Sequence, residues 1–397
     1  MSSFNFDKIN ERKGSGSSKW DFMPYPDLPE NAIAMWVADM DFEAAPSVMA
    51  SIHKGLEMPA LGYFKLGDEY FDAIINWHKN RHGRNDFTKE NLAYHNGVLG
   101  GVCSAVVALT DPGDLILVQG PGYPAFARVI ENLGRAVQAD PLINENGYYT
   151  YNFAQMEKTI KEKKIKVAIL CNPHNPTGRV WSREELSEYI DICYRNGVKV
   201  IVDEIWADWE LDRGNLPYTS AFIANEKTKE IGIGFYSASK GFNLAGLVAS
   251  YSICHNADMQ KALEDVFSPA HYNNPNFLST RAVIGAYSEE GALWMDACAD
   301  YVSGNMDLVV DYCQKNMPKL KVRKPDATYL MWLDFTAYGI DQDEIIRRTA
   351  YVAGVVMNDG TAFVCDGEGH MRMNMATPRK YVEEALPRLK AAFADIE

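Results

Sequence analysis

The chain has 397 residues, of which 47% are hydrophobic and 23% charged, a composition typical of a folded protein large enough for two domains. Its formal net charge is −14, from 39 basic and 53 acidic residues, which argues against nucleic acid or an anionic membrane as the main partner. No apolar run reaches the roughly 18 residues of a membrane-spanning helix, so we expect no such helix.

Cysteine usage and the N-terminal sequence favour a cytoplasmic location. The seven cysteines are odd in number and widely spaced, and none forms a C-x-x-C pair, so we interpret them as reduced core thiols. The stretch MSSFNFDKINERKGSGSS is polar, unlike a signal peptide or an anchor.

The chain divides into three parts by sequence pattern. Residues 1–45 are rich in proline and aromatic residues, which predicts an arm or part of a small domain that packs across domains or onto a second subunit. Residues 46–285 contain six apolar runs, which predict strands. The runs begin at Asn91, Leu115, Lys166, Val198, Ile231 and Val248. Helix-length segments separate many of them, and one of these, residues 182–196, opens with the capping box Ser182-x-x-Glu185. Such alternation predicts a large α/β domain with a mostly parallel sheet.

The sequence pattern changes in residues 286–397 and predicts a small α+β domain with its own sheet. A helical pattern over residues 280–316 is expected to bend near Gly304. The strand TYLMWLDF, the helix DEIIRRTAYVAG and the strand HMRMNMA follow. A final helix from Arg379 contains Pro387, a residue that can kink a helix.

Two turn-rich motifs follow predicted strands. HNGVLGGV, residues 95–102, precedes an apolar helix, and free N–H groups at such a helix start suit a phosphate dianion; a purely structural turn is the alternative. CNPHNPTGRV, residues 171–180, has two Asn-Pro steps and a glycine, which can hold an asparagine amide at a fixed angle; a structural loop is again the alternative.

Two ionisable side chains stand at predicted strand ends. Asp203 ends VIVDE, where a carboxylate is costly without a cation or several donors; a helix N-cap or a core salt bridge is the alternative. Lys240 stands in GFYSASKGFNLAGL beside Ser237 and Ser239, and a simple ion pair is its alternative. A lysine that forms a Schiff base and a carboxylate that keeps a ring nitrogen protonated fit a carbonyl cofactor, and the two serines can donate to a phosphate.

The motifs NPHNPTG, VDEIWAD, SASKGFNLAGL and RMNMATPR, in this order, resemble the class I/II aminotransferase superfamily of pyridoxal 5′-phosphate (PLP) enzymes of fold type I. More narrowly, MWVADMDF, GYPAF, CNPHNPTGRVW and TYLMWLDF are similar to its cystathionine β-lyase (C–S lyase) branch. The resemblance covers nearly the whole chain. It implies PLP as the cofactor, no metal, and an α/β fold with a mostly parallel seven-stranded sheet in the large domain and a smaller α+β C-terminal domain.

The resemblance also implies site residues. Lys240 would be the catalytic residue and carry PLP, Asp203 would pair with the pyridine N–H, and Asn175 would bond the phenolic O3′. The other cofactor-binding residues would be Val98 and Leu99 through their N–H groups, Ser237 and Ser239 through their hydroxyls, Tyr123 by stacking on the ring, and Tyr63 at the phosphate of the neighbouring subunit. The shared phosphate contact implies a homodimer.

For the substrate, an amino acid, the resemblance implies that Arg372 binds the α-carboxylate as a bidentate fork and that Val37 and Ala38 line that end of the pocket. The released Lys240 amine would remove the Cα proton. A thiolate leaving group on Cβ would then be eliminated, and the products would be a thiol, pyruvate and ammonia.

Two other functions stay open. An aminotransferase would use the same residues, and a cofactor-binding or regulatory protein would have lost turnover, although the intact Lys240 and Arg372 argue against that loss.

Several positions depart from the family pattern. Gly241 stands where the branch usually has Thr or Ser, and Trp206 where relatives offer His or Tyr near O3′. Val248 replaces the arginine that many aminotransferases place on the phosphate, which favours the lyase. Val364 and His370 also differ from relatives, and we interpret His370 as a residue of the pocket rim rather than an acid or base.

Overall fold

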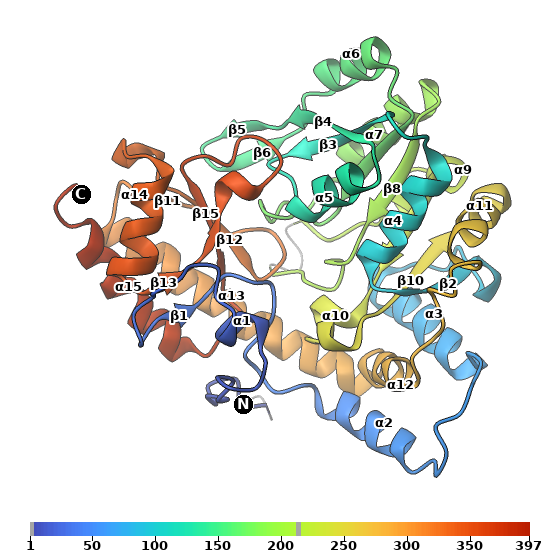
Figure 1. Ribbon diagram of the computed structural model, residues 1–397, viewed down its shortest axis with the longest axis horizontal. Coiled ribbons are helices and arrows are strands. Elements are labelled where there is room, and N and C mark those ends of the chain that lie inside the picture. The colour runs from blue at the N-terminus through green and yellow to red at the C-terminus, as the bar shows by residue number, and fades with distance from the viewer. Residues whose placement is uncertain (1–3, 212–215) are drawn as a thin grey trace.

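The computed structural model describes residues 4–211 and 216–397. Its large sheet has seven strands in the order β2-β10-β9-β8-β7-β3-β4 (Figure 1). The strands are β2 (Leu92–Asn96), β3 (Leu115–Gly120), β4 (Ala136–Pro141), β7 (Val167–Cys171), β8 (Lys199–Asp203), β9 (Gly232–Tyr236) and β10 (Ala249–Cys254). Only the two pairings of β10 are antiparallel. The mostly parallel seven-stranded sheet of an α/β fold is confirmed.

Helices cover both faces of this sheet because alternate strand residues are apolar on each side. Leu117 of β3 packs into one apolar cluster, whereas its neighbour Ile116 packs into another. The first cluster includes α6 (Phe153–Lys163) and α7 (Arg183–Arg195); the second includes α4 (Val98–Leu109), α5 (Pro124–Asn132) and α11 (Ala257–Phe267). The capping box of α7 forms as predicted, with Ser182 Oγ accepting from the Glu185 N–H at 3.1 Å.

A second sheet has four antiparallel strands in the order β11-β12-β15-β14. These are β11 (Lys321–Val322), β12 (Leu330–Asp334), β14 (Asn358–Asp359) and β15 (His370–Asn374). The helices of this part are α13 (Glu289–Asn316), α14 (Gln342–Ile346), a π-helix (Arg347–Val352) and α15 (Arg379–Phe393). The predicted division at residues 45/46 and 285/286 stays a prediction.

The helical pattern of residues 280–316 is interrupted, but not at the expected place. α12 (Phe277–Ala286) ends before α13 begins, and Ser288 caps α13 by accepting from the Gly291 N–H at 3.0 Å. α13 runs unbroken through Gly304. A Cβ added at Gly304 would lie 3.0 Å from Arg379 Nη2, so the glycine makes room for that guanidinium.

The N-terminal segment packs against the C-terminal part of the molecule. Its strand β1 (Ile33–Ala34) pairs in parallel with β13 (Val355–Val356), and α1 (Ser18–Asp21) precedes β1. After α2 (Pro46–Leu56), the connection to α3 (Asp68–His82) projects from the body of the molecule (Figure 1). Shorter elements are β5 (Ile143–Glu145), β6 (Tyr148–Thr150), α8 (Ala221–Ala224), α9 (Thr228–Ile231), α10 (Ala238–Gly241) and 3₁₀ turns at Lys89–Asn91, Ala245–Leu247, Thr336–Tyr338 and Gly360–Ala362.

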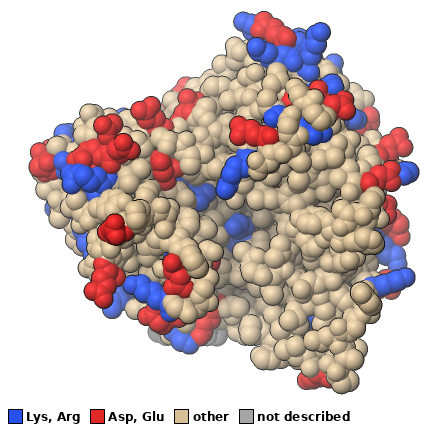
Figure 2. Space-filling model, in the orientation of Figure 1, with Lys and Arg blue, Asp and Glu red and all other residues tan. Residues whose placement is uncertain are grey.

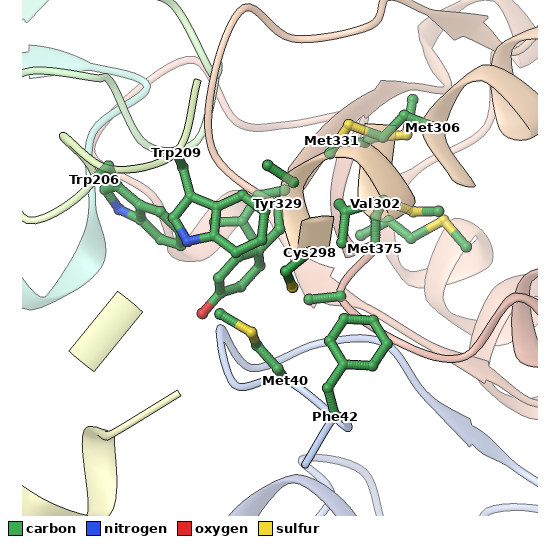
Figure 3. Packing of buried hydrophobic residues seen from close by; sticks show 14 of the residues in the cluster. Met40, Phe42, Trp206, Trp209, Cys298, Val302, Met306, Tyr329, Met331 and Met375 are labelled. Atoms are coloured by element: carbon green, nitrogen blue, oxygen red, sulfur yellow. The ribbon is translucent and has the colours of Figure 1, made fainter. Parts of the chain in front are cut away.

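An aromatic and sulfur-rich core joins the two parts of the chain. Figure 3 shows Trp206, Trp209 and Tyr329 side by side near Met40, and their ring centroids lie 4.7 Å (Trp206–Tyr329) and 4.8 Å (Trp209–Tyr329) apart. Trp209 Nε1 donates to the carbonyl of Lys240 at 2.6 Å, so this core fixes the backbone at Lys240. No helix of residues 4–211 and 216–397 is long and apolar enough to cross a membrane.

Candidate active site

A cavity of about 340 Å³ lies at the carboxyl ends of the parallel strands. Cys171 ends β7, Asp203 ends β8 and Ser237 follows β9, and all three line it. Parallel sheets direct their ligands to this edge. On the face shown in Figure 2, basic side chains lie in a recess between the two parts of the molecule.

The cavity brings together most of the predicted site residues. Those that line it are Ala38, Val98, Leu99, Tyr123, Asn175, Asp203, Ser237, Ser239 and Lys240. Arg372 is not in the wall but bonds to Asn175 behind it. Val37 is also outside the wall, and its carbonyl accepts from Asn374 Nδ2 at 2.7 Å. Tyr63 is fully exposed on the projecting connection.

Lys240 presents a poorly hydrated amine to the cavity. Its Nζ donates to the Ala38 carbonyl at 2.8 Å and lies 5.7 Å from the ring centre of Trp206. Burial lowers the pKa of Lys240 to about 8; the Arg372 charge acts in the same direction, and Asp39 and Asp203 oppose it. A large share of the amine is therefore neutral, and nucleophilic, near pH 8.

Asp203 is a buried carboxyl without an ion-pair partner among the described residues. It is 4% exposed, and its Oδ1 accepts one hydrogen bond, from the Ile205 N–H at 3.1 Å. Burial raises the pKa of Asp203 to about 7, although that N–H group and the Lys240 charge lower it. A protonated ring nitrogen in the cavity would supply the missing donor.

Arg372, on β15, is a buried cation that neutral oxygens hold. Nη1 donates to Asn175 Oδ1 at 2.9 Å, and Nη2 donates to Asn358 Oδ1 at 2.5 Å and to the Trp36 carbonyl at 3.3 Å. Within residues 4–211 and 216–397, no carboxylate pairs with Arg372 and its Nε has no partner. Burial lowers its pKa to about 10. A carboxylate supplied by a ligand would complete this site.

The start of α4 forms an anion cradle at the other end of the cavity. Gly97 precedes the helix with a φ of 85°, and the N–H groups of Val98 and Leu99 have no carbonyl acceptor in the first turn. A Cβ at Gly100 would lie 1.8 Å from the hydroxyl oxygen of Tyr272, which also lines the cavity. This end therefore suits a compact dianion such as a phosphate.

The two serines beside Lys240 differ in their surroundings. Ser237 Oγ donates to the Ala249 carbonyl and accepts from the Ser239 N–H at 3.0 Å, so its proton is already used. The Ser239 hydroxyl has no partner among the described residues and faces the cavity. Ser239 is thus better placed than Ser237 to donate to a phosphate.

The positions that depart from the family pattern lie as follows. A Cβ at Gly241 would lie 3.0 Å from Asp208 Oδ2, so a side chain there would point toward Asp208. Trp206 and Val248 line the cavity. His370 is not a rim residue: it is 7% exposed, stacks on Trp332 at 5.1 Å and does not line the cavity.

Three residues at the site were missed in the sequence. Tyr272 lies in a connection without a periodic pattern, and Asn358 lies on a two-residue strand. Asn374 had a detectable signal, because it follows Arg372 by two residues on one strand and therefore shares its face.

A cofactor with an aldehyde, a phosphate and a basic ring nitrogen fits the Lys240 amine, the α4 cradle and the Asp203 carboxyl. Fold and cavity together define a PLP-dependent enzyme of fold type I. Residues 33–389 match the family model described as aminotransferase class I and II, and the chain belongs to this family.

The most informative similarities are to proteins named as cystathionine β-lyase or C–S lyase. Cystathionine beta-lyase PatB of Bacillus subtilis (strain 168) is 34% identical over 391 residues, covering 98% of this chain and 100% of that protein. Cystalysin from Treponema denticola, whose crystal structure contains PLP, has a TM-score of 0.94 and 31% identity, covering 99% of this chain and 100% of that one. The PLP-bound C-S lyase from Staphylococcus hominis has a TM-score of 0.89 and 34% identity over 98% of each chain. The predicted family, fold and cofactor are confirmed.

Proposed function

We propose that the protein is a PLP-dependent carbon–sulfur β-lyase of amino-acid metabolism. Its substrate is cystathionine, cysteine or a related S-substituted cysteine, and its products are a thiol, pyruvate and ammonia, with one water consumed. The observation that carries the proposal is the Arg372 guanidinium, which is buried without a carboxylate partner among the described residues and lies close to the Lys240 amine. Relatives named for cystathionine and C–S lyase activity support the choice of reaction.

The cofactor, when bound, supplies an aldehyde for the substrate amine and a ring that accepts electrons from Cα. Asp203 would hold the proton of the ring nitrogen. The phosphate would be held by the N–H groups of Val98 and Leu99 and by the Ser239 hydroxyl. Ser237, whose proton is donated to the Ala249 carbonyl, would fix the Ser239 backbone by accepting from its N–H. Tyr123 would cover the ring, and Asn175, whose Oδ1 is engaged by Arg372, would offer its Nδ2 to O3′.

The reaction needs a carboxylate anchor and a base. Arg372 binds the substrate α-carboxylate and so orients Cα, since a guanidinium can form two parallel hydrogen bonds. Lys240, with a pKa of about 8, is partly neutral near pH 8 and takes the proton from Cα. When Cβ carries a sulfur substituent, loss of that proton allows the thiolate to leave.

A product assay separates this proposal from its alternative. Cystathionine incubated with the holoenzyme alone should give pyruvate and free thiol in equal amounts. An aminotransferase would require an added keto acid and release no thiol, and that result would refute the lyase. The apolar Val248 at the phosphate end of the cavity favours the lyase over aminotransferases with an arginine there.

We also propose a cytoplasmic homodimer. Tyr63 is fully exposed on the projecting connection of residues 57–67, which supports a contact with the phosphate end of a second subunit. All seven cysteines are free thiols, which supports a reducing compartment. Light scattering of the wild type and of Tyr63→Ala, combined with PLP affinity, tests the shared site: Tyr63→Ala should weaken PLP binding without unfolding the protein.

A further inference from the structure

The loop of residues 36–41 is held by side chains along its whole length. Each of its six backbone carbonyls accepts a hydrogen bond from a side chain. The donors come from the C-terminal sheet, from the active site and from the N-terminal arm. Loops rarely engage side-chain donors so completely, which indicates that the position of this backbone matters.

Asn374 provides the central contacts from the C-terminal sheet. Its Nδ2 donates to the Val37 carbonyl and to the Asp39 carbonyl, both at 2.7 Å. Asn374 is fully buried, and its Oδ1 accepts from the Ala376 N–H at 2.8 Å. The amide is thus completely used, and its orientation is fixed.

The carbonyl between these two belongs to Ala38, the acceptor for Lys240 Nζ at 2.8 Å. One buried amide therefore brackets the only loop carbonyl that binds the active-site amine. From the other side, Lys19 Nζ donates to the Asp39 carbonyl at 3.1 Å and pairs with Asp41 at 2.6 Å. The loop is fixed from both sides of Ala38.

We propose that Asn374 is a positioning residue for the reaction. By holding the carbonyls of Val37 and Asp39, it fixes the position of the Ala38 carbonyl, which accepts a hydrogen bond from the Lys240 amine. The inference rests on the proposed function, in which Lys240 removes the Cα proton. A base must lie within hydrogen-bond reach of that proton, and a misplacement of about 1 Å can cost about 100-fold in rate. An amine that donates to the Ala38 carbonyl keeps one position, whereas a free lysine side chain samples many rotamers.

Arg372 should be affected much less than Lys240. Its bond to the Trp36 carbonyl is long, at 3.3 Å, while Asn175 and Asn358 hold it at 2.9 and 2.5 Å. Loss of Asn374 should therefore slow proton transfer and leave carboxylate binding intact.

Asn374→Ala tests the proposal, with Asn305→Ala as the matched control. Asn305 is also fully buried; it donates to two carbonyls, of Met375 at 3.3 Å and Thr377 at 2.9 Å, and accepts from Arg379 Nε at 3.0 Å. Each substitution removes a buried amide that bridges two carbonyls. A purely structural role predicts similar losses in both variants.

Two measurements test the role of Asn374 without a substrate that carries a leaving group on Cβ. The first is exchange of the α-proton of L-alanine with deuterated solvent, followed by NMR with the holoenzyme. Asn374→Ala should lower the maximal exchange rate about 10- to 100-fold without changing half-saturation by alanine. The second is the pH dependence of the rate at which cofactor-free protein regains its visible absorbance with added PLP. Its midpoint should move to lower pH, because the Lys240 ammonium loses a carbonyl acceptor. Asn305→Ala should change neither quantity.

Equal exchange by wild type and Asn374→Ala, or equal losses in both variants, would overturn the proposal. If Asn374→Ala does not fold, Lys19→Met, which removes another donor to the Asp39 carbonyl, should lower the exchange rate about threefold or more at unchanged half-saturation; an unchanged rate would also overturn it. A wild type without any exchange would instead refute Lys240 as the base, and with it the proposed function.

Discussion

Replacing Asp203 by asparagine is expected to stabilise the cofactor-free protein at pH 8 while removing most of its activity. Asp203 is 4% exposed, and burial raises its pKa from 3.8 to about 7. Above that pH the folded protein holds a buried carboxylate that has no ion-pair partner in the described part of the chain, a cost absent from the unfolded chain. The variant has no such charge to bury.

Linkage gives the size of the effect. Each pKa unit corresponds to about 1.4 kcal/mol, so a rise from 3.8 to about 7 costs the folded state at most about 4 kcal/mol at pH 8. Because the folded pKa lies above the unfolded one, the wild type loses stability relative to the variant as the pH rises through this interval. The asparagine amide also needs partners, so we expect a gain of about 2–4 kcal/mol in the free energy of unfolding.

Urea unfolding of cofactor-free protein at pH 4, 6 and 8 measures this gain. Asp140→Asn is the matched control, because Asp140 is 3% exposed, has a pKa raised to about 6 by burial and lies outside the cavity. Both variants should gain stability at pH 8, the control by less, and only Asp203→Asn should bind PLP more weakly. An Asp203→Asn protein no more stable than wild type at pH 8, or equally favoured at pH 4, would refute the reasoning.

Three further outcomes are expected. Lys240→Ala should abolish turnover but keep the circular dichroism spectrum of the wild type; loss of the fold would make Lys240 structural. Arg372→Lys should raise KM about 10- to 100-fold in steady-state kinetics, because the second parallel hydrogen bond is lost, and an unchanged KM would exclude Arg372 as the carboxylate anchor. Val248→Gly should raise the free energy of unfolding by about 1 kcal/mol in urea, because a β-branched residue is strained at a φ of 56°; no gain would argue against that strain.

The strands could be predicted because burial on both faces leaves an uninterrupted apolar run. All six runs recognised in the sequence are strands of the large sheet. The seventh, β4, has no such run: it lies at the sheet edge, Ala136 is exposed and Asp140 interrupts it. The break at Ser288 was missed because helical periodicity continues on both sides of it, and only the cap reveals it.

The site was partly predictable for a similar reason. Asp203 and Lys240 follow apolar strands, and an ionisable side chain in apolar surroundings indicated a functional residue at each position. Asn374 acts on Val37, 337 residues earlier in the chain, and no local pattern records such a contact. Arg372 was assigned by resemblance alone, since an arginine within an apolar strand has no distinctive spacing.

Burial moves every charged group of the site toward its neutral form: it raises the pKa of Asp203 and lowers those of Lys240 and Arg372. A ligand group of opposite charge offsets the free-energy cost of burying each charge, and the protonated ring nitrogen would do so for Asp203. PLP should therefore stabilise the wild type more than Asp203→Asn, because only the wild type recovers the cost of its buried carboxylate. At pH 8 and equal excess of PLP, the two gains in the free energy of unfolding should differ by about 2–4 kcal/mol. Equal gains would show that the ring nitrogen does not meet Asp203.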